Sequence, residues 1–278
     1  MLKQRVITAV ALLAILLPAL FYPSPTPFCV VALVLIAAGG WEWGCLNGLQ
    51  QIGSLGIAAM CVGFCGVAWA LGWLHQPMPW LWAAGGAAWV LGGGFLLARG
   101  VPGWAELPKN LRLIGGVGAL CLAWLALAQA RILGIEFLLS VLLLVWVADI
   151  SAYFAGRRFG GRFSRRKLAV SISPGKSWEG VWGGMAGVML MAGFWLIVHP
   201  AGRSLYHRLI EKHGFLVMAI SVVFLAAMSV VGDLIESLIK RSAGTKDSSA
   251  LLPGHGGVLD RVDALLPTLP LAMMLVSF

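Results

Sequence analysis

The sequence predicts an all-α polytopic integral membrane protein with about nine transmembrane helices and a cytoplasmic N-terminus. Of its 278 residues 60% are hydrophobic, and the mean hydropathy is +0.90. Only 11% are charged, against about 25% in an ordinary soluble domain. Long apolar runs recur along the chain, and a spanning helix needs about 20 residues. The runs do not alternate apolar and polar residues, which argues against a transmembrane β-barrel.

The expected spans follow one another from end to end. The first comes after Lys3 and Arg5; it is longer than the core of a signal peptide and no cleavage site follows it, so we expect it to be retained. The second has an ill-defined end around Glu42, which lies between two tryptophans that suggest an interfacial anchor. The last contains Pro267 and Pro270, so a kinked or partly inserted segment is an alternative there. The expected spans cover residues 6–22, 28–46, 52–74, 79–98, 111–130, 132–150, 179–198, 214–235 and 264–278.

Basic residues set the orientation. If the N-terminus is cytoplasmic, sixteen of the twenty lysines and arginines fall in cytoplasmic segments, as the positive-inside rule requires. The loops 151–178 and 236–263 then lie on the same, cytoplasmic side. We therefore divide the chain into spans one to six, residues 1–147, and a catalytic transmembrane region, residues 148–278.

The net charge of +9 indicates anionic partners at the membrane. Because the basic residues are divided among membrane loops, a nucleic acid is disfavoured, and a lipid headgroup or a nucleotide from the cytosol fits better. For the arginine-rich loop 157–167, a purely topological role stays open.

Glycines mark one face of the seventh span. Gly180, Gly183, Gly184 and Gly187 form two small-xxx-small pairs, which permit close helix packing in lipid. Packing within the chain and a dimer interface are both open.

The first polar segment, residues 148–180, carries an anion-binding pattern. Asp149 closes span six, and Tyr153 follows one turn later on the same face. Ser173, Lys176 and Ser177 then lead into span seven, where backbone N–H groups, an ammonium and a hydroxyl can meet an anion. Simple N-capping is the alternative for Ser177. The Gly-Lys-Ser triplet is no P-loop, because the earlier glycine that this motif requires is missing.

The second polar segment, residues 232–263, places acidic and basic residues on one helical face. If span eight continues, Asp233, Glu236, Ser237, Lys240 and Arg241 share that face, and a simple i,i+4 ion pair between Glu236 and Lys240 is the alternative. Downstream, PGHGG is a flexible turn that lets the backbone approach a ligand closely. His255 in this turn could act as a base, but we expect a positioning role. The remaining candidates are Lys246, Asp260, Arg261 and Asp263.

The aspartates of this segment predict a magnesium site. Asp233, Asp260 and Asp263 would repel one another at low dielectric unless they shared a cation. They are hard oxygen ligands with no cysteine beside them, which favours Mg²⁺ over zinc. The surrounding lysines and arginines would neutralise charge on a transferring group. We therefore expect phosphoryl or nucleotidyl transfer at the cytoplasmic face, with a lipid as one reactant.

The run SLIKRSAGTKDSSALLPGHGGVLDRVD, Ser237 to Asp263, resembles the signature of the phosphatidate cytidylyltransferases, or CDP-diacylglycerol synthases. The D-x-x-A-Y and SPGKSWEG motifs of the first polar segment are similar too. The resemblance implies in-line attack of the phosphatidate phosphate on the α-phosphorus of CTP, giving CDP-diacylglycerol and pyrophosphate. It also implies a bacterial-type inner membrane location and a homodimer.

The resemblance further implies roles for single residues. Asp233 and Asp260 would hold Mg²⁺, with Asp263 and Asp149 as further ligands or supports and a second cation such as K⁺ as an open addition. The phosphates of CTP or lipid would be bound by Lys176, Lys240, Arg241, Lys246 and Arg261.

Two other functions stay open at this point. A CTP-dependent kinase acting on a polyprenol or diacylglycerol could use the same cations but would release CDP. A transporter is a third possibility, since intramembrane carboxylates often relay ions. The carboxylates here fall at expected helix ends and in loops, which argues against transport.

Overall fold

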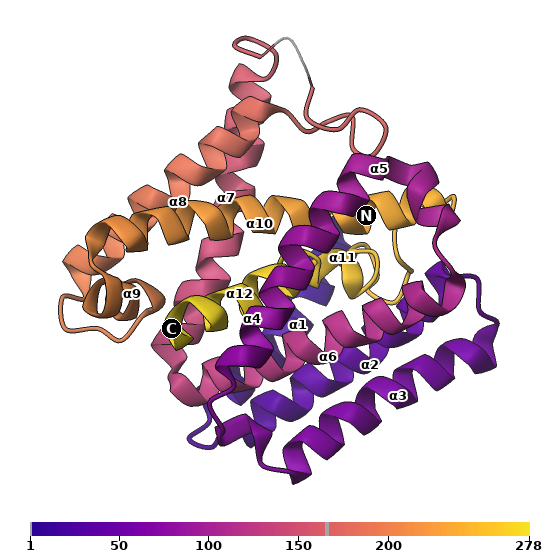
Figure 1. Cartoon of the computed structure of the whole chain (residues 1–278), viewed down its shortest axis with the longest axis horizontal. Helices are drawn as coiled ribbons and strands as arrows, with labels where there is room; N and C mark the ends of the chain where they lie inside the picture. Colours follow the sequence, from indigo (N-terminus) through magenta and orange to yellow (C-terminus); the bar gives the residue numbers. More distant parts are fainter. Residues whose placement is uncertain (1, 165–166) are drawn as a thin grey trace.

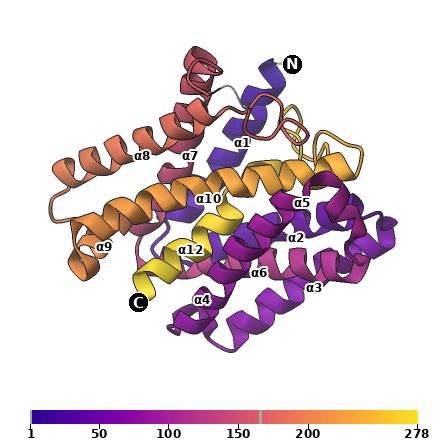
Figure 2. The same ribbon diagram turned by 45° about the horizontal axis from the view of Figure 1, so that its top comes forward.

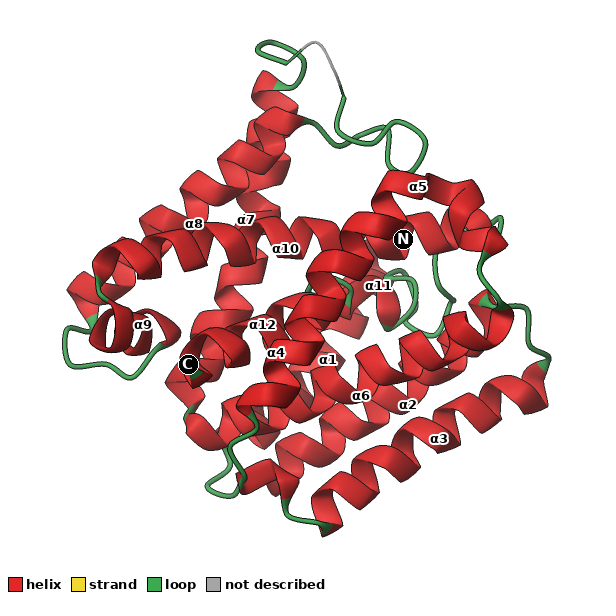
Figure 3. Cartoon of the chain, in the orientation of Figure 1, coloured by secondary structure: helices red, strands yellow, loops and turns green. Residues whose placement is uncertain are grey.

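The computed structural model describes residues 2–164 and 167–278, with side chains from Gln4 onward; Arg165 and Arg166 of the basic loop lie outside the described residues. Within these ranges the chain is helical, without a strand ladder (Figure 3). The helices, in chain order, are α1 (Leu2–Phe21), α2 (Thr26–Leu46), α3 (Gln51–Ala70), α4 (Pro79–Ala87), α5 (Gly93–Glu106), α6 (Lys109–Leu133), α7 (Ile135–Phe159), α8 (Trp178–Val198), α9 (Leu205–His213), α10 (Phe215–Ser242), α11 (Leu259–Val262) and α12 (Leu265–Ser277).

Eight helical segments among the described residues are long and apolar enough to cross a membrane. One of them joins α4 to α5 through a π-helical turn at Ala88–Gly92. The predicted ninth span corresponds to α12, whose 13 residues extend only about 20 Å, short of the roughly 30 Å of a bilayer core. The prediction of nine spans is therefore not confirmed, while the prediction of an all-α membrane protein is.

Two of the spans extend beyond their predicted polar ends. α7 continues through Asp149 to Phe159, and α10 continues through Asp233 to Ser242. Hydropathy marks only the apolar part of a helix, whereas arginine, lysine and glutamate are good helix formers and let it continue. Asp149 and Asp233 thus project from helices whose backbones fix their positions.

Helices from both halves of the chain pack together. α2, α3 and α6 lie side by side as one layer, and α7 and α8 form an antiparallel hairpin (Figure 1). α10 crosses between these groups and contacts α5, α8 and α12 (Figure 2). α12 packs on α4, α6 and α10 and ends beside α9, where the Lys212 ammonium donates to the Val276 carbonyl. Near its start, α12 lies against α10, where Pro267 is close to Gly232.

The glycine face of α8 packs on α7 within the chain. A Cβ at Gly184 would lie 2.9 Å from the Ala148 carbonyl oxygen, and one at Gly180 would lie 3.0 Å from that of Ala152. Gly183 and Gly187 likewise meet side chains of α7. Of the two open interpretations, the structure supports packing within one chain, and this packing fixes the α7 backbone that carries Asp149.

Gly184→Ala is expected to destabilise the protein by about 1–3 kcal/mol, because the added methyl group would press on the backbone of α7, which cannot move aside cheaply. Thermal unfolding of the purified protein in detergent measures this. Gly193→Ala is the matched control on the same helix, since nothing lies within 4 Å of its Cβ position. Equal melting temperatures for both variants would contradict the packing described here.

Candidate active site

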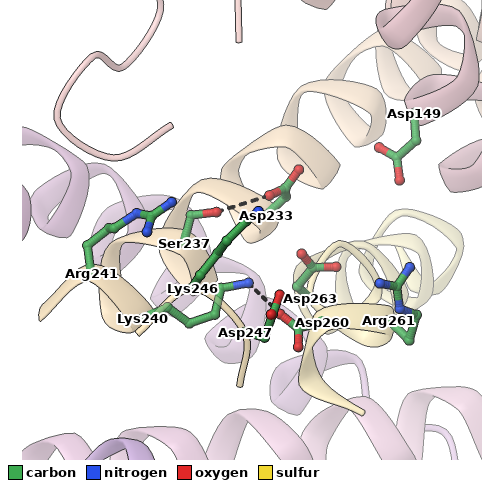
Figure 4. Close-up of a pocket in the computed structure, with 10 residues that line it drawn as sticks. All are labelled: Asp149, Asp233, Ser237, Lys240, Arg241, Lys246, Asp247, Asp260, Arg261 and Asp263. Atoms are coloured by element: carbon green, nitrogen blue, oxygen red, sulfur yellow. Dashed lines mark hydrogen bonds and ion pairs between the residues drawn. The ribbon is translucent and has the colours of Figure 1, made fainter. Parts of the chain in front are cut away.

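A polar cavity of about 310 Å³ lies where α7, α10 and the segment before α12 meet (Figure 4). Its volume falls within the usual range of small-molecule sites, about 300–1,000 Å³. The side chains that line it are Asp149, Asp233, Ser237, Lys240, Arg241, Lys246, Asp247, Asp260, Arg261 and Asp263. The structure therefore brings residues of both polar segments, far apart in the sequence, into one cavity.

Asp233 occupies the wall formed by α10. The Ser237 hydroxyl, one turn later, donates to its Oδ1 at 3.4 Å, and the Lys176 ammonium forms an ion pair with its Oδ2. Gly232 allows the close approach of α10 to the next segment, because a Cβ there would collide with the Asp263 carbonyl oxygen and Pro267. This glycine explains how Asp233 and Asp263 come to face the same space.

Asp263 lies just before α12, and its Oδ1 accepts a 2.8 Å hydrogen bond from the Ala264 N–H. Burial, together with the negative charges of Asp233 and Asp149, raises the pKa of this carboxyl to about 7. The Ala264 N–H and the Lys240 ammonium act in the opposite direction. Asp149 points from α7 into the space that Asp233 and Asp263 face (Figure 4). A cation among these carboxylates would relieve their repulsion.

Asp260 is held differently, because both of its oxygens already accept hydrogen bonds from the chain. Oδ2 accepts from the Ser248 N–H at 2.9 Å, the Ser248 hydroxyl at 2.8 Å and the Gly257 N–H at 2.7 Å. Oδ1 accepts from the Lys240 ammonium at 2.5 Å. Burial alone would raise the pKa of Asp260, but the hydrogen bonds from Lys240, Gly257 and Ser248 outweigh it and hold the pKa at about 2. In this arrangement Asp260 organises the loop before α11.

Lys240 is a buried link between two carboxylates. Its ammonium forms ion pairs with Glu236, one turn earlier on α10, and with Asp260. The Lys240 side chain is 12% exposed, and each carboxylate is 7% exposed. The ion-pair alternative considered for Lys240 is thus present in the structure, and the second partner, Asp260, ties α10 to α11.

Three further basic side chains border the cavity. Arg241 and Lys246 are exposed, and Arg241 donates to the Ile172 carbonyl at 3.5 Å. Arg261 donates through Nε and Nη2 to the His255 carbonyl, at 2.9 and 2.6 Å. Facing the carboxylates, these cations suit the cavity to a polyanion such as a nucleoside triphosphate.

Five of the predicted site residues, all of them described in the structure, do not line the cavity. Lys176 does not line the cavity, but its ammonium forms an ion pair with Asp233, which does. Ser177 is the N-cap of α8 and accepts from the Gly180 N–H at 3.2 Å, which is the capping alternative. Tyr153 is exposed, and its hydroxyl accepts from Arg157 at 2.9 Å. Ser173 lies in the turn that precedes α8. The His255 ring nitrogen Nδ1 is buried and has no hydrogen-bond partner among the described residues.

Sequence reasoning missed Glu42 and Asp247. Asp247 lines the cavity. Glu42 is fully buried and accepts hydrogen bonds from the loop between α10 and α11. A signal existed for Glu42, because it is a lone acid in an apolar run, and such a residue needs a partner. Interpreting it as part of an interfacial anchor was wrong, since its side chain is 0% exposed.

The cavity fits a divalent cation of the magnesium type. Among the described residues no group of three histidine, cysteine, aspartate or glutamate side chains is arranged to hold a metal ion. Magnesium does not require such a cage, since it is usually bound by one or two carboxylates, waters and substrate phosphates. Asp233 and Asp263 face the same space, and the Lys176 ammonium against Asp233 shows that this position accommodates a cation. Asp260 is less suited, because its oxygens are already engaged.

Comparisons with known proteins give a consistent result. The profile of the Cytidylyltransferase family matches residues 3–278. A protein of Pseudomonas aeruginosa named phosphatidate cytidylyltransferase is 39% identical over 276 residues, covering 97% of this chain and 95% of that relative. One of Haemophilus influenzae with the same name is 37% identical over 295 residues, covering 97% and 96%. One of Thermotoga maritima is 42% identical over 134 residues, covering 48% and 46%. The similarity to the first two extends over the apolar first half as well as both polar segments.

Proposed function

Because the chain belongs to the cytidylyltransferase family, we propose that it joins CTP to phosphatidate, forming CDP-diacylglycerol and pyrophosphate in the cavity described above. The chain is a nucleotidyltransferase, and its described residues include eight apolar helical segments long enough to span a membrane. The observation that carries the assignment of this cavity is the convergence of carboxylates from α7, α10 and the segment before α12 with basic side chains.

The chemistry divides between carboxylates and cations. Asp233 and Asp263 would hold Mg²⁺, with Asp149 completing the acidic wall, and the bound metal would neutralise phosphate charge as a Lewis acid. Lys246, Arg241 and Arg261 orient the triphosphate of CTP. A phosphatidate phosphate oxygen forms a bond to the α-phosphorus, and the bond from that phosphorus to its bridging oxygen breaks. Pyrophosphate leaves with the electron pair of the broken bond.

Lys176 connects the two polar segments in this proposal. Its ion pair with Asp233 places an ammonium at the edge of the cavity, at the N-terminal end of α8. With Mg²⁺ held by the carboxylates, this ammonium would be available to contact a phosphate. Lys240 and Asp260 have the supporting role of fixing the loop, because they already engage one another.

The location and assembly of the protein are part of the proposal. The excess of basic residues in the segments that share a side with the cavity supports a cytoplasmic active site in a bacterial inner membrane. Residues 148–278 supply the cavity and form the catalytic region. A second cation such as K⁺ and a homodimer are implied by the family resemblance, and the mass of the protein in a detergent complex tests the dimer.

Two radiolabels test the reaction directly. With phosphatidate and Mg²⁺ in detergent micelles, label from [α-³²P]CTP is expected in the lipid and label from [γ-³²P]CTP in pyrophosphate. Without Mg²⁺, both products are expected to disappear. Transfer of the γ-label to diacylglycerol or a polyprenol would reveal a kinase and overturn the proposal. Absence of labelled lipid from either nucleotide, together with substrate flux into vesicles, would favour a transporter.

A further inference from the structure

A buried glutamate outside the cavity holds the loop that forms one of its walls. Glu42 lies near the end of α2, with none of its surface exposed. Its Oε1 accepts from the Ser249 hydroxyl at 2.6 Å and the Val258 N–H at 2.8 Å. Its Oε2 accepts from the Leu259 N–H at 2.8 Å and lies 3.1 Å from the Ser248 hydroxyl, whose single proton it shares with Asp260. One carboxylate thus bonds both ends of the segment 248–259.

The local sequence is adapted to this approach. A Cβ on Gly257 would collide with the Glu42 carboxylate and the Ser248 hydroxyl, so glycine is required for the loop to close around Glu42. Among residues described with side chains, no lysine, arginine or histidine forms an ion pair with Glu42. Its buried charge is therefore balanced by N–H and O–H donors of the loop, and burial without them would be costly.

The contacts of Glu42 continue into the cavity. The Ser248 hydroxyl lies within hydrogen-bond distance of both Glu42 and Asp260, and Asp260 bonds Lys240 of α10. Residues Arg261 and Asp263, which line the cavity, follow directly in α11 and after it. Any shift of the loop away from α2 would carry these side chains with it.

We propose that Glu42 is a positioning residue: it anchors the 248–259 loop to α2 and so sets the placement of Arg261 and Asp263 in the cavity. The activity measurements rest on the proposed function, but the anchoring itself does not. The competing explanation is that Glu42 only adds stability to the bundle. The two explanations predict different results, because loss of anchoring would loosen one loop, whereas loss of general stability would affect the whole protein.

Glu42→Gln is the sharpest test, because it keeps the size of the side chain. Each oxygen of Glu42 accepts one backbone N–H. In either orientation the amide NH₂ of glutamine therefore faces a backbone donor and leaves it unsatisfied. Loss of that hydrogen bond is expected to speed amide exchange by about 10- to 100-fold at whichever of Val258 and Leu259 faces the NH₂ group.

Turnover should fall as well, since a displacement of about 1 Å at a site can cost about 100-fold in rate. We expect kcat for CDP-diacylglycerol formation to fall by about 100-fold in Glu42→Gln, with a higher Mg²⁺ concentration at half-maximal activity. Glu42→Asp keeps both acceptor oxygens on a shorter side chain. Its kcat and its Mg²⁺ concentration at half-maximal activity should therefore lie between those of Glu42→Gln and the wild-type protein. Ser249→Ala removes one donor and should give a smaller change in the same direction. Glu106→Gln, at an exposed ion pair with Arg99, is the matched control.

The full-length protein in detergent is compared by hydrogen exchange, melting temperature and steady-state kinetics. A lower melting temperature with an unchanged Mg²⁺ midpoint and unchanged exchange at residues 258 and 259 would overturn the proposal. If Glu42→Gln does not fold, the other two variants decide. The proposal would be overturned if both Glu42→Asp and Ser249→Ala showed the same amide exchange and the same Mg²⁺ midpoint as the wild-type protein. If the wild-type protein forms no CDP-diacylglycerol, the proposed function fails, and hydrogen exchange alone decides whether Glu42 anchors the loop.

Discussion

Asp233→Asn is expected to lower the rate of CDP-diacylglycerol formation by about 10³-fold or more, equivalent to at least about 4 kcal/mol of transition-state stabilisation. Asparagine keeps the shape of the side chain but loses the negative charge that would hold the cation. The Asp233 side chain is 32% exposed and that of its partner Lys176 is 24% exposed. The released lysine can therefore be solvated, and the fold should persist. Initial rates at saturating CTP and Mg²⁺ measure the effect.

Two further variants define the specificity of this loss. Asp263→Asn is expected to match Asp233→Asn, because both carboxylates face the same part of the cavity. Glu211→Gln makes the same chemical change at an exposed position of α9 and should retain full activity. Wild-type turnover in a folded Asp233→Asn protein would remove the proposed metal role of this residue.

Lys240→Met is expected to cost about 3–5 kcal/mol of stability, because removal of one partner from a buried ion-pair group leaves uncompensated charges. Glu236 would be left with a buried carboxylate facing no cation, and Asp260 would lose one of its donors. The midpoint of thermal or denaturant unfolding in detergent measures the loss. Lys109→Met, at an exposed lysine that donates to the Gly48 carbonyl, is the control and should be close to wild type.

A double variant separates the contribution of Lys240 to stability from its role in the site. Glu236→Gln combined with Lys240→Met removes the unpaired charge, so most of the lost stability should return. Activity should return with it if Lys240 acts only by balancing the buried charge of Glu236. A double variant that is stable yet inactive would show that Lys240 is needed in the site itself, either as the tie to Asp260 or as the phosphate contact predicted from the sequence. A Lys240→Met protein as stable as wild type would contradict the buried network.

Much of the fold follows from local properties of the sequence. Apolar runs of lipid-spanning length predict the eight spanning segments found among the described residues, since hydropathy is a property of each segment alone. The glycine face of α8 was also visible in the sequence, although its partner, α7, was not identified from it. The predicted bounds of the last segment, 264–278, are close to those of α12, but its prediction as a ninth span is not confirmed, because this apolar helix of 13 residues packs against protein, where no spanning length is required.

The candidate site could be predicted in composition but not in its internal bonding. Repulsion among aspartates points to a cation, and the structure brings Asp149, Asp233 and Asp263 to one cavity. It also gives Asp260 a full set of donors, which spacing within α11 cannot reveal, because Ser248 and Lys240 reach it from other segments. Glu42 is the extreme case, since its partners lie more than 200 residues away. Contacts of that kind depend on how α2 and α10 pack, which no local pattern encodes.

Binding of Mn²⁺, a spectroscopic substitute for Mg²⁺, tests most directly whether carboxylates of α10 and the segment before α12 share a divalent cation with the nucleotide. Free Mn²⁺ is followed by electron paramagnetic resonance as the full-length protein is titrated in detergent, with and without CTP. The account predicts saturable binding by the wild-type protein that tightens with CTP and weakens at least tenfold in Asp233→Asn and Asp263→Asn, but not in Glu211→Gln. Equal Mn²⁺ affinity in all four proteins would contradict it.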